Sequence, residues 1–229
     1  MFHYRRAHAA ETKKASEDMP FAQQMTMSTA QARPFQKRIA ERQISRIGVV
    51  GSNPTTAPVI EASWSRFLRV FDAHLQQHPY LLGERPRAGN MACFGQMTML
   101  VITDPTPMAV ALESSPRAYA WTVRLEDLSG LEPTGEDWAD LAGKHATLHD
   151  LLSEVGRVYA PFMLANDEAV ARGAARVECE IDGQPWGQEP FVYQAKCLRW
   201  LRERFEALPI ADRERVGTAL SGTGCEALL

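Results

Sequence analysis

The sequence predicts an all-α protein, a helical bundle arranged around one buried central helix. Apolar residues recur at three- and four-residue spacings along most of the chain. Several of the implied helices begin with a capping residue or an early proline. The segment from Met91 to Ile102 is apolar on nearly every side, because only Gln96 and Thr98 carry side chains that form hydrogen bonds. Such a helix needs neighbours all round, so we expect it at the centre of the bundle.

Length and composition favour one soluble helical domain spanning residues 1–229. A chain of 229 residues with 45% hydrophobic content can bury a sizeable core. The apolar run at 91–102 is shorter than the roughly 20 residues that cross a bilayer, so no membrane partner is expected. Lys and Arg total 25 against 28 Asp and Glu, so overall charge indicates neither nucleic acid nor an anionic surface as a partner.

The cysteines and the first residues indicate a cytoplasmic protein. The four cysteines are widely spaced and form no Cys-x-x-Cys pair, and a chain of this size does not need disulfides. We therefore expect reduced thiols. The opening residues lack the uninterrupted apolar core of a signal peptide.

The first 47 residues predict two helices joined by a connector. Residues 1–18 have the composition of a helix whose beginning belongs further upstream, and Pro20 is expected to close it. Residues 19–30 are expected to be a connector. The helix expected over 32–47 carries a basic face, which is interpreted either as a solvated surface or as an anion or nucleic-acid patch: Arg33, Lys37, Arg38, Arg42 and Arg46.

The next helices carry recognisable start signals. After a connector at 48–56, Thr55 or Thr56 is expected to cap an amphipathic helix with an apolar stripe from Ile60 to Leu75. Asp104 and Ser115, each followed by a proline, predict two more helix starts after the central helix. The second of these helices is expected to stop at Gly130.

The last hundred residues are expected to be a loop-rich segment at 131–147 and a helical extension at 148–229. An apolar stripe from Leu148 to Met163 predicts a helix kinked at Pro161, and another helix is expected over 191–208. Alternating residues around Asp182-Gly183 predict a small β-hairpin near 176–188, in which Pro185 restricts the second strand to an edge. The tail at 222–229 is expected to be irregular.

One stretch carries a family resemblance. Leu81-Leu82-Gly83, a loop ending at Pro86, and Ala88-Gly89-Asn90 opening a buried helix resemble the start of the central helix in the C-terminal, all-helical domain of glutathione transferases. That family carries Ser or Thr, two residues, then Asp, whose side chains cap each other's backbone N–H groups. Arg87 and Asn90 hold these places here, so the negative charge at the helix start is absent. The Asp104-Pro-Thr-Pro turn and the Arg117–Trp121 helix are similar to a subgroup of bacterial transferase-like proteins.

The resemblance implies that this chain supplies the hydrophobic, electrophile-binding side of a glutathione transferase. In the family, the catalytic residue and the glutathione site belong to a preceding thioredoxin-like half, which we expect this sequence to lack. We therefore assign no catalytic residue, and glutathione is expected as a co-substrate only if that half is supplied by a longer product or another chain. By position, Phe2, Tyr4 and Arg5 are the candidates for the electrophile wall; alternatively, Phe2 and Tyr4 pack within the bundle.

A second hypothesis is a non-catalytic scaffold that dimerises or binds a small ligand. A homodimer is expected in either case. No metal ligand is predicted: His145 and His149 are four residues apart near Glu136, Asp140 and Glu154, but the Glu of a His-Glu-x-x-His motif is lacking. Cys93, within the central helix, is expected to be an inert small hydrophobe, and Cys225, in the glycine-rich tail, the most exposed thiol.

Overall fold

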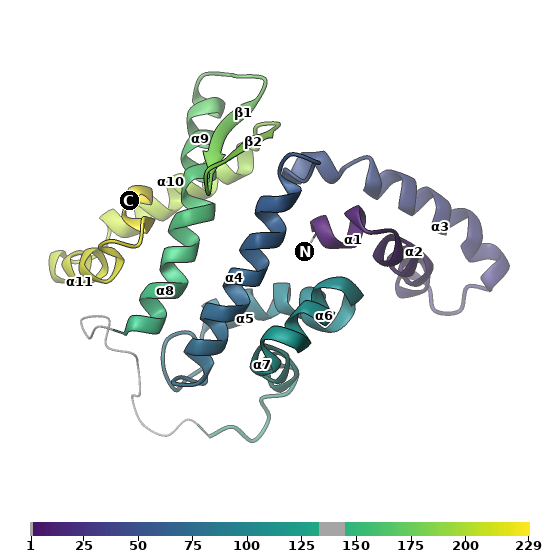
Figure 1. Ribbon diagram of the computed structural model, residues 1–229, viewed down its shortest axis with the longest axis horizontal. Coiled ribbons are helices and arrows are strands. Elements are labelled where there is room, and N and C mark those ends of the chain that lie inside the picture. The colour runs from purple at the N-terminus through teal and green to yellow at the C-terminus, as the bar shows by residue number, and fades with distance from the viewer. Residues whose placement is uncertain (1, 133–144) are drawn as a thin grey trace.

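The protein is mostly helical, as the sequence predicts. The structure, a computed structural model, describes residues 2–132 and 145–229. Within these ranges the helices are accompanied by a single two-stranded antiparallel sheet. Helix α4 (Ala57–Leu75) runs through the middle of the molecule and has helices on both flanks (Figure 1). No helix in the described ranges is both long and apolar enough to cross a membrane.

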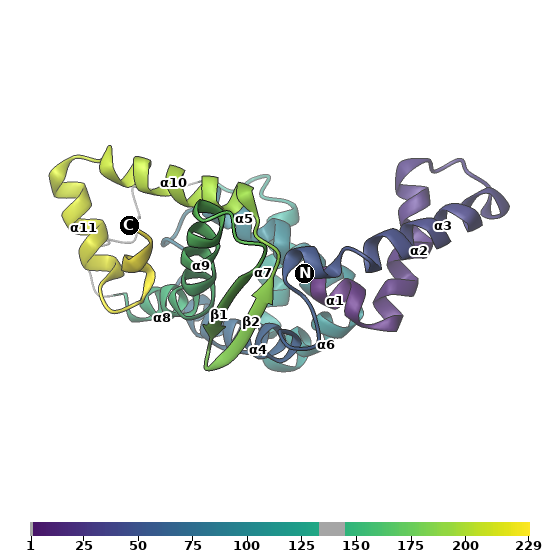
Figure 2. The ribbon, with the colours of Figure 1, turned by 90° about the horizontal axis from the view of Figure 1, so that it is seen from above.

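The N-terminal helices are α1 (Phe2–Ala7), α2 (Ala9–Gln23) and α3 (Thr29–Ile44), followed by a 3₁₀ turn at Ile47–Val50. Helix α1 lies against the body, and α2 and α3 project from it as an arm (Figure 2). The predicted single helix over 1–18 is wrong because the backbone bends at His8, which adopts an extended conformation. Pro20 lies inside α2 and does not end it, so the connector predicted at 19–30 shrinks to the residues between the two helices. Ser28 caps α3 by accepting a hydrogen bond from the Gln31 N–H.

The predicted central segment is helical, but α4 occupies the centre. Helix α5 (Ala88–Met97) passes into a π-helical turn at Thr98–Thr103. Met97, Leu100 and Val101 are buried, whereas Met91 is 42% exposed. The prediction that this helix is enclosed on all sides is therefore wrong for its first turns, which begin at the surface. The fully buried side chains of Leu68 and Phe71 place α4 at the middle of the first apolar core.

Of the three predicted helix caps, one forms and two do not. Ser115 caps α7 (Pro116–Glu126) by accepting from the Ala118 N–H, as predicted. Asp104 precedes α6 (Pro105–Ser114) but makes no capping bond; its carboxylate accepts from Arg5, and Glu11 of α2 accepts from the Thr106 N–H instead. Thr56 precedes α4 without capping it, because its hydroxyl donates to the Gly51 carbonyl.

The C-terminal part contains a second apolar core. Helix α8 (Ala146–Glu154) continues through a π-helical turn at Val155–Tyr159 into α9 (Ala160–Ala171), so the helix is irregular immediately before Pro161, where the kink is predicted. The second core forms where α9 packs against the hairpin and the C-terminus, and it includes Val59 of α4. Of the predicted loop-rich segment 131–147, residues 133–144 lie outside the described residues.

The predicted hairpin is confirmed. Strands β1 (Val177–Ile181) and β2 (Gln184–Gln188) pair antiparallel around Asp182 and Gly183, whose φ angles of 55° and 71° suit a two-residue turn. Helices α10 (Val192–Glu206) and α11 (Ile210–Leu220) follow. The prediction of an irregular tail at 222–229 is wrong in part, because residues Cys225–Leu228 form a 3₁₀ turn that packs on the body with Leu228 buried.

Candidate functional site

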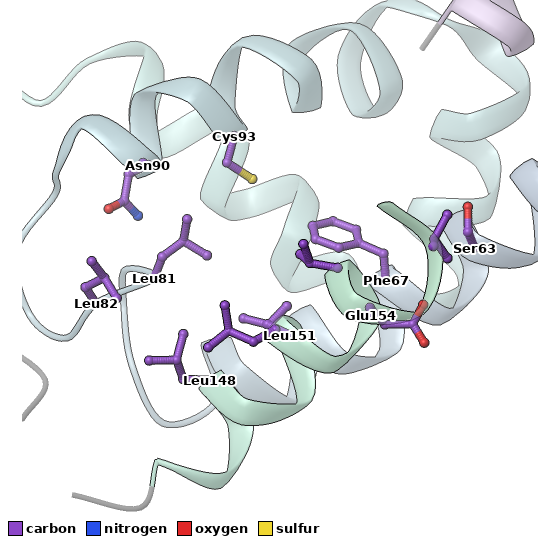
Figure 3. A pocket seen from close by; sticks show the side chains of 13 residues that line it. Ser63, Phe67, Leu81, Leu82, Asn90, Cys93, Leu148, Leu151 and Glu154 are labelled. Atoms are coloured by element: carbon purple, nitrogen blue, oxygen red, sulfur yellow. The ribbon is translucent and has the colours of Figure 1, made fainter. Parts of the chain in front are cut away.

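An apolar cavity of about 440 Å³ lies between α4, α5, the loop before α5, and α8 with its π-helical turn (Figure 3). Its size falls within the range of small-molecule sites. Most of its lining is aliphatic or aromatic, with a few polar groups at its margins. The lining residues are Ser63, Phe67, Leu81, Leu82, Gly89, Asn90, Cys93, Leu148, Leu151, Leu152, Glu154, Val155 and Val158.

Helical periodicity supplies two walls of the cavity. Ser63 and Phe67 are four residues apart on α4 and share one face. Leu148, Leu151 and Leu152 follow the same spacing on α8, and the labelled Leu148 and Leu151 point into the same hollow as Phe67 (Figure 3). Part of the apolar stripe of each helix therefore lines the cavity.

The loop before α5 is fixed by hydrogen bonds. Tyr80 and Gly83 exchange backbone bonds, with N–O distances of 3.2 and 3.3 Å, and Gly83 has a φ of 105° that favours glycine. The buried His74 donates through Nε2 to the Tyr80 carbonyl and accepts through Nδ1 from the Thr147 hydroxyl. Burial lowers the pKa of His74, so the ring stays neutral and holds the loop against α8. Leu81 and Leu82 are thereby positioned in the wall.

Asn90 gives the cavity a hydrogen-bonding group. Its side chain is fully buried, and its Oδ1 accepts from the Arg87 N–H at 3.0 Å. Its Nδ2 has no hydrogen-bond partner among the described residues. A buried donor left without a partner costs free energy, which a ligand acceptor would recover. Figure 3 shows this amide at one end of the cavity, with the nitrogen turned toward Leu81.

The other polar groups of the lining are occupied or neutral. The Glu154 carboxylate forms an ion pair with Arg66 at 3.0 Å, so its negative charge is balanced within the protein. Burial raises the pKa of the Cys93 thiol to about 11, so at neutral pH this residue is a protonated, apolar part of the wall, as the sequence predicts. No described lining residue is a histidine or lysine that could activate the thiol. The arrangement suits reversible binding of an apolar molecule that carries one hydrogen-bond acceptor.

The predicted electrophile-wall residues lie on α1, on the other flank of α4 from α8 (Figure 1). Phe2 begins this helix, and its side chain is outside the described part of the structure. Tyr4 is 4% exposed and belongs to the first core, the packing alternative named above, and burial together with the charge of Glu61 raises its pKa. Arg5 donates to Asp104 at 3.0 Å and contacts Met99 Sδ. Tyr4 and Arg5 do not line the apolar cavity.

The other sequence candidates do not form a site in the described structure. His149 lies 3.3 Å from the Ser221 carbonyl, whereas the His145 ring contacts His78; Glu136 and Asp140 lie outside the described residues. Cys225 is 5% exposed and donates to the Leu152 carbonyl, so the prediction that it is the most exposed thiol is wrong. The tail folds back over α8, which a glycine-rich sequence does not reveal.

The basic face of α3 is solvated. Of the basic residues of the predicted face, Arg33, Arg38 and Arg42 in α3 are exposed, as are Lys37 in the same helix and Arg46, which follows it. Lys37 pairs with Glu41, and Arg38 covers the Phe35 ring. These contacts are typical of a surface helix. Sequence reasoning identified Asn90 only as a cap, and it missed a cluster of His3, His8 and Glu61, whose members are separated by a bend and by about fifty residues.

Comparisons with protein-family models, curated proteins and solved structures found no match to this chain. The resemblance to glutathione transferases therefore depends on the sequence motifs alone and stays a proposal.

Proposed function

We propose that this chain is the helical half of a glutathione transferase-like protein, and that its part in the function is to hold an apolar ligand between α4, α5 and α8. One observation carries the proposal. The residues that give the resemblance also line the apolar cavity: Leu81, Leu82, Gly89 and Asn90. The motif and the cavity thus occupy the same place in the fold.

The start of α5 supports the family assignment. The family's Asp caps this helix by accepting a hydrogen bond from the backbone N–H three residues earlier. Asn90 Oδ1 accepts from the Arg87 N–H at 3.0 Å, which is the same bond made by a neutral side chain. The substitution of Asn for Asp therefore retains the geometry and gives up the charge.

The proposed ligand is a small hydrophobic electrophile with a carbonyl or nitro oxygen. Its apolar part would contact Phe67 and the leucines of α8, and its oxygen would accept from Asn90 Nδ2. Thiol transfer needs a glutathione site, for which the described residues offer only a two-stranded hairpin and no larger sheet. We propose that a thioredoxin-like half, in a longer product or another chain, supplies this chemistry.

The binding test uses two glycines of the same helix. Both Gly89 and Gly95 belong to α5, and an added Cβ would meet no neighbouring atom within 4 Å at either, but only Gly89 lines the cavity. We expect N-phenyl-1-naphthylamine, an apolar fluorophore, to bind the wild-type chain saturably. Gly89→Leu should weaken this binding about tenfold, and Gly95→Leu should leave it within about twofold. Equal affinity in both variants, or absence of saturable binding, would contradict the proposal.

The transferase assignment has its own test. The purified chain with glutathione and 1-chloro-2,4-dinitrobenzene should show no turnover above the uncatalysed rate, and titration calorimetry should detect no glutathione binding. Turnover or glutathione binding by this chain alone would contradict the proposed dependence on a second half. If a thioredoxin-like half added in trans restores neither, the chain is a ligand-binding scaffold without transferase function.

A homodimer is the second candidate function, and the exposed apolar side chains of α10 favour it. Val192 is 69% exposed, Tyr193 58% and Trp200 42%, an unusual concentration for one helix face in water. Sedimentation at micromolar concentration should show a dimer that Val192→Glu converts to monomer. Leu112→Glu, at a 46% exposed apolar residue of α6, is the control. A monomeric wild-type chain would exclude this function.

A further inference from the structure

Three potential metal ligands meet beside the start of α4. His3 lies in α1, His8 at the bend between α1 and α2, and Glu61 in the first turns of α4. His3 Nε2 lies 3.0 Å from Glu61 Oε1, and His8 Nε2 lies 3.5 Å from the same oxygen. The ligand atoms of all three residues are within 4.8 Å of one another. This cluster is separate from the apolar cavity, whose lining includes none of these residues.

The bend at His8 creates the cluster. In an unbroken helix, residues five apart differ by about 140° around the axis, so His3 and His8 would diverge. His8 instead has a φ of −100° and a ψ of 133°, and its ring returns to within 5.8 Å of the His3 ring, centroid to centroid. This long-range arrangement explains why sequence spacing gives no metal motif.

The spacing of the ligand atoms fits a small divalent cation. Ligands bound at about 2.0–2.1 Å in a tetrahedron stand roughly 3.3 Å from each other. The two distances to Glu61, 3.0 and 3.5 Å, bracket that value. Two imidazoles and one carboxylate form a donor set typical of zinc sites that keep a fourth position for water.

The surroundings orient the ligands and leave the site accessible. His3 is 4% exposed, and its Nδ1 lies 2.8 Å from the hydroxyl of the buried Ser52, which fixes the ring with Nε2 toward Glu61. Tyr4 stacks on His8 with ring centroids 5.7 Å apart. His8 Nε2 is buried and has no hydrogen-bond partner among the described residues. The side chains of His8 and Glu61 are 34% and 46% exposed, so an ion can enter from solvent.

We propose that His3, His8 and Glu61 bind a zinc-like divalent cation, with water at the remaining position. A bound cation would give His8 Nε2 the partner that it lacks and would join the bend between α1 and α2 to α4. The competing interpretation is a hydrogen bond between His3 and Glu61, with the His8 ring close beside it and no metal. The two differ in whether the chain binds one equivalent of metal through these residues.

The test uses untagged chain, freed of metal by chelation, and Zn²⁺ alone as the titrant. Calorimetry should give one ion per chain, the thermal midpoint should rise with Zn²⁺, and Co²⁺ should give visible absorption bands of a four-coordinate site. His8→Gln and Glu61→Gln should each weaken Zn²⁺ binding at least about tenfold. His3 is left intact because its burial makes its replacement a risk to folding.

His149→Gln is the matched control, because it removes an exposed imidazole from α8 outside the cluster. Circular dichroism of each metal-free variant establishes that the fold is retained. Binding that His149→Gln leaves unchanged and that the two cluster variants lose supports the site. Absence of stoichiometric Zn²⁺ binding, or equal binding by wild type and both cluster variants, would overturn it.

Discussion

Arg66 of α4 and Glu154 of α8 form an ion pair that closes one end of the apolar cavity. Arg66 Nε donates to both carboxylate oxygens, at 3.0 and 3.1 Å, and both side chains are about 85% buried. Arg66 Nη1 also lies 2.8 Å from Asp182 in the hairpin turn. One guanidinium therefore joins α4, α8 and the hairpin.

Replacing Arg66 by Gln should destabilise the fold by about 2–3 kcal/mol, because it leaves Glu154 charged in a largely apolar setting. Arg157, 3.8 Å from Glu154, compensates for part of the loss. Urea unfolding followed by circular dichroism measures the change. Lys37→Gln is the control, since its pair with Glu41 is exposed and should change stability by less than about 0.5 kcal/mol.

Glu11 shows why some caps follow from the sequence and others do not. Ser115 caps the helix that begins at the next residue, so the signal is local. Glu11 accepts from the Thr106 N–H of a helix almost a hundred residues later, and no sequence window contains both. The hairpin turn at Asp182-Gly183 was predictable for the same local reason as Ser115.

Burial alone would raise the pKa of Glu11, but hydrogen bonds from Thr106 outweigh it and the pKa is lowered. Ionisation therefore contributes stability that is present above the unfolded pKa, about 4.5, and is lost as pH falls through the lower folded value. Glu11→Gln should cost about 1 kcal/mol at pH 7 and flatten the decline of stability below pH 4.5. Urea midpoints from pH 7 to pH 3 test this, with the exposed Glu17→Gln as control. An unchanged acid slope would contradict it.

The candidate sites also depend on long-range contacts that no local sequence signal reveals. The stripes of α4 and α8 predicted two helices, yet only the fold shows that Phe67 and Leu151 leave a cavity between them. The His3, His8 and Glu61 cluster depends on a bend and on a contact between distant elements. Periodicity identifies which face of a helix is apolar, but the partner of that face is set by tertiary packing.

Gly156 permits the C-terminal turn to pack on the π-helical segment. A Cβ at this position would overlap the backbone carbonyl of Thr223. Gly156→Ala should therefore cost about 2 kcal/mol, since backbone must move to relieve the overlap. Gly217→Ala, in α11 with open space around it, should instead be neutral or stabilise by up to about 1 kcal/mol. Thermal unfolding compares the two, and equal midpoints would refute the role of Gly156.

The alkylation rate of Cys93 can be used to detect ligand binding in the cavity. Because burial raises its pKa to about 11, little thiolate exists at neutral pH, and alkylation by iodoacetamide should be slow and rise with pH beyond pH 9. Saturating N-phenyl-1-naphthylamine should slow the reaction further, since the thiol lines the proposed site. Peptide mass spectrometry measures each cysteine separately, and Cys197 of α10, outside the cavity, should react equally with and without the fluorophore. Gly89→Leu should raise the fluorophore concentration that gives half-protection of Cys93 about tenfold; an unchanged concentration would contradict binding in the cavity.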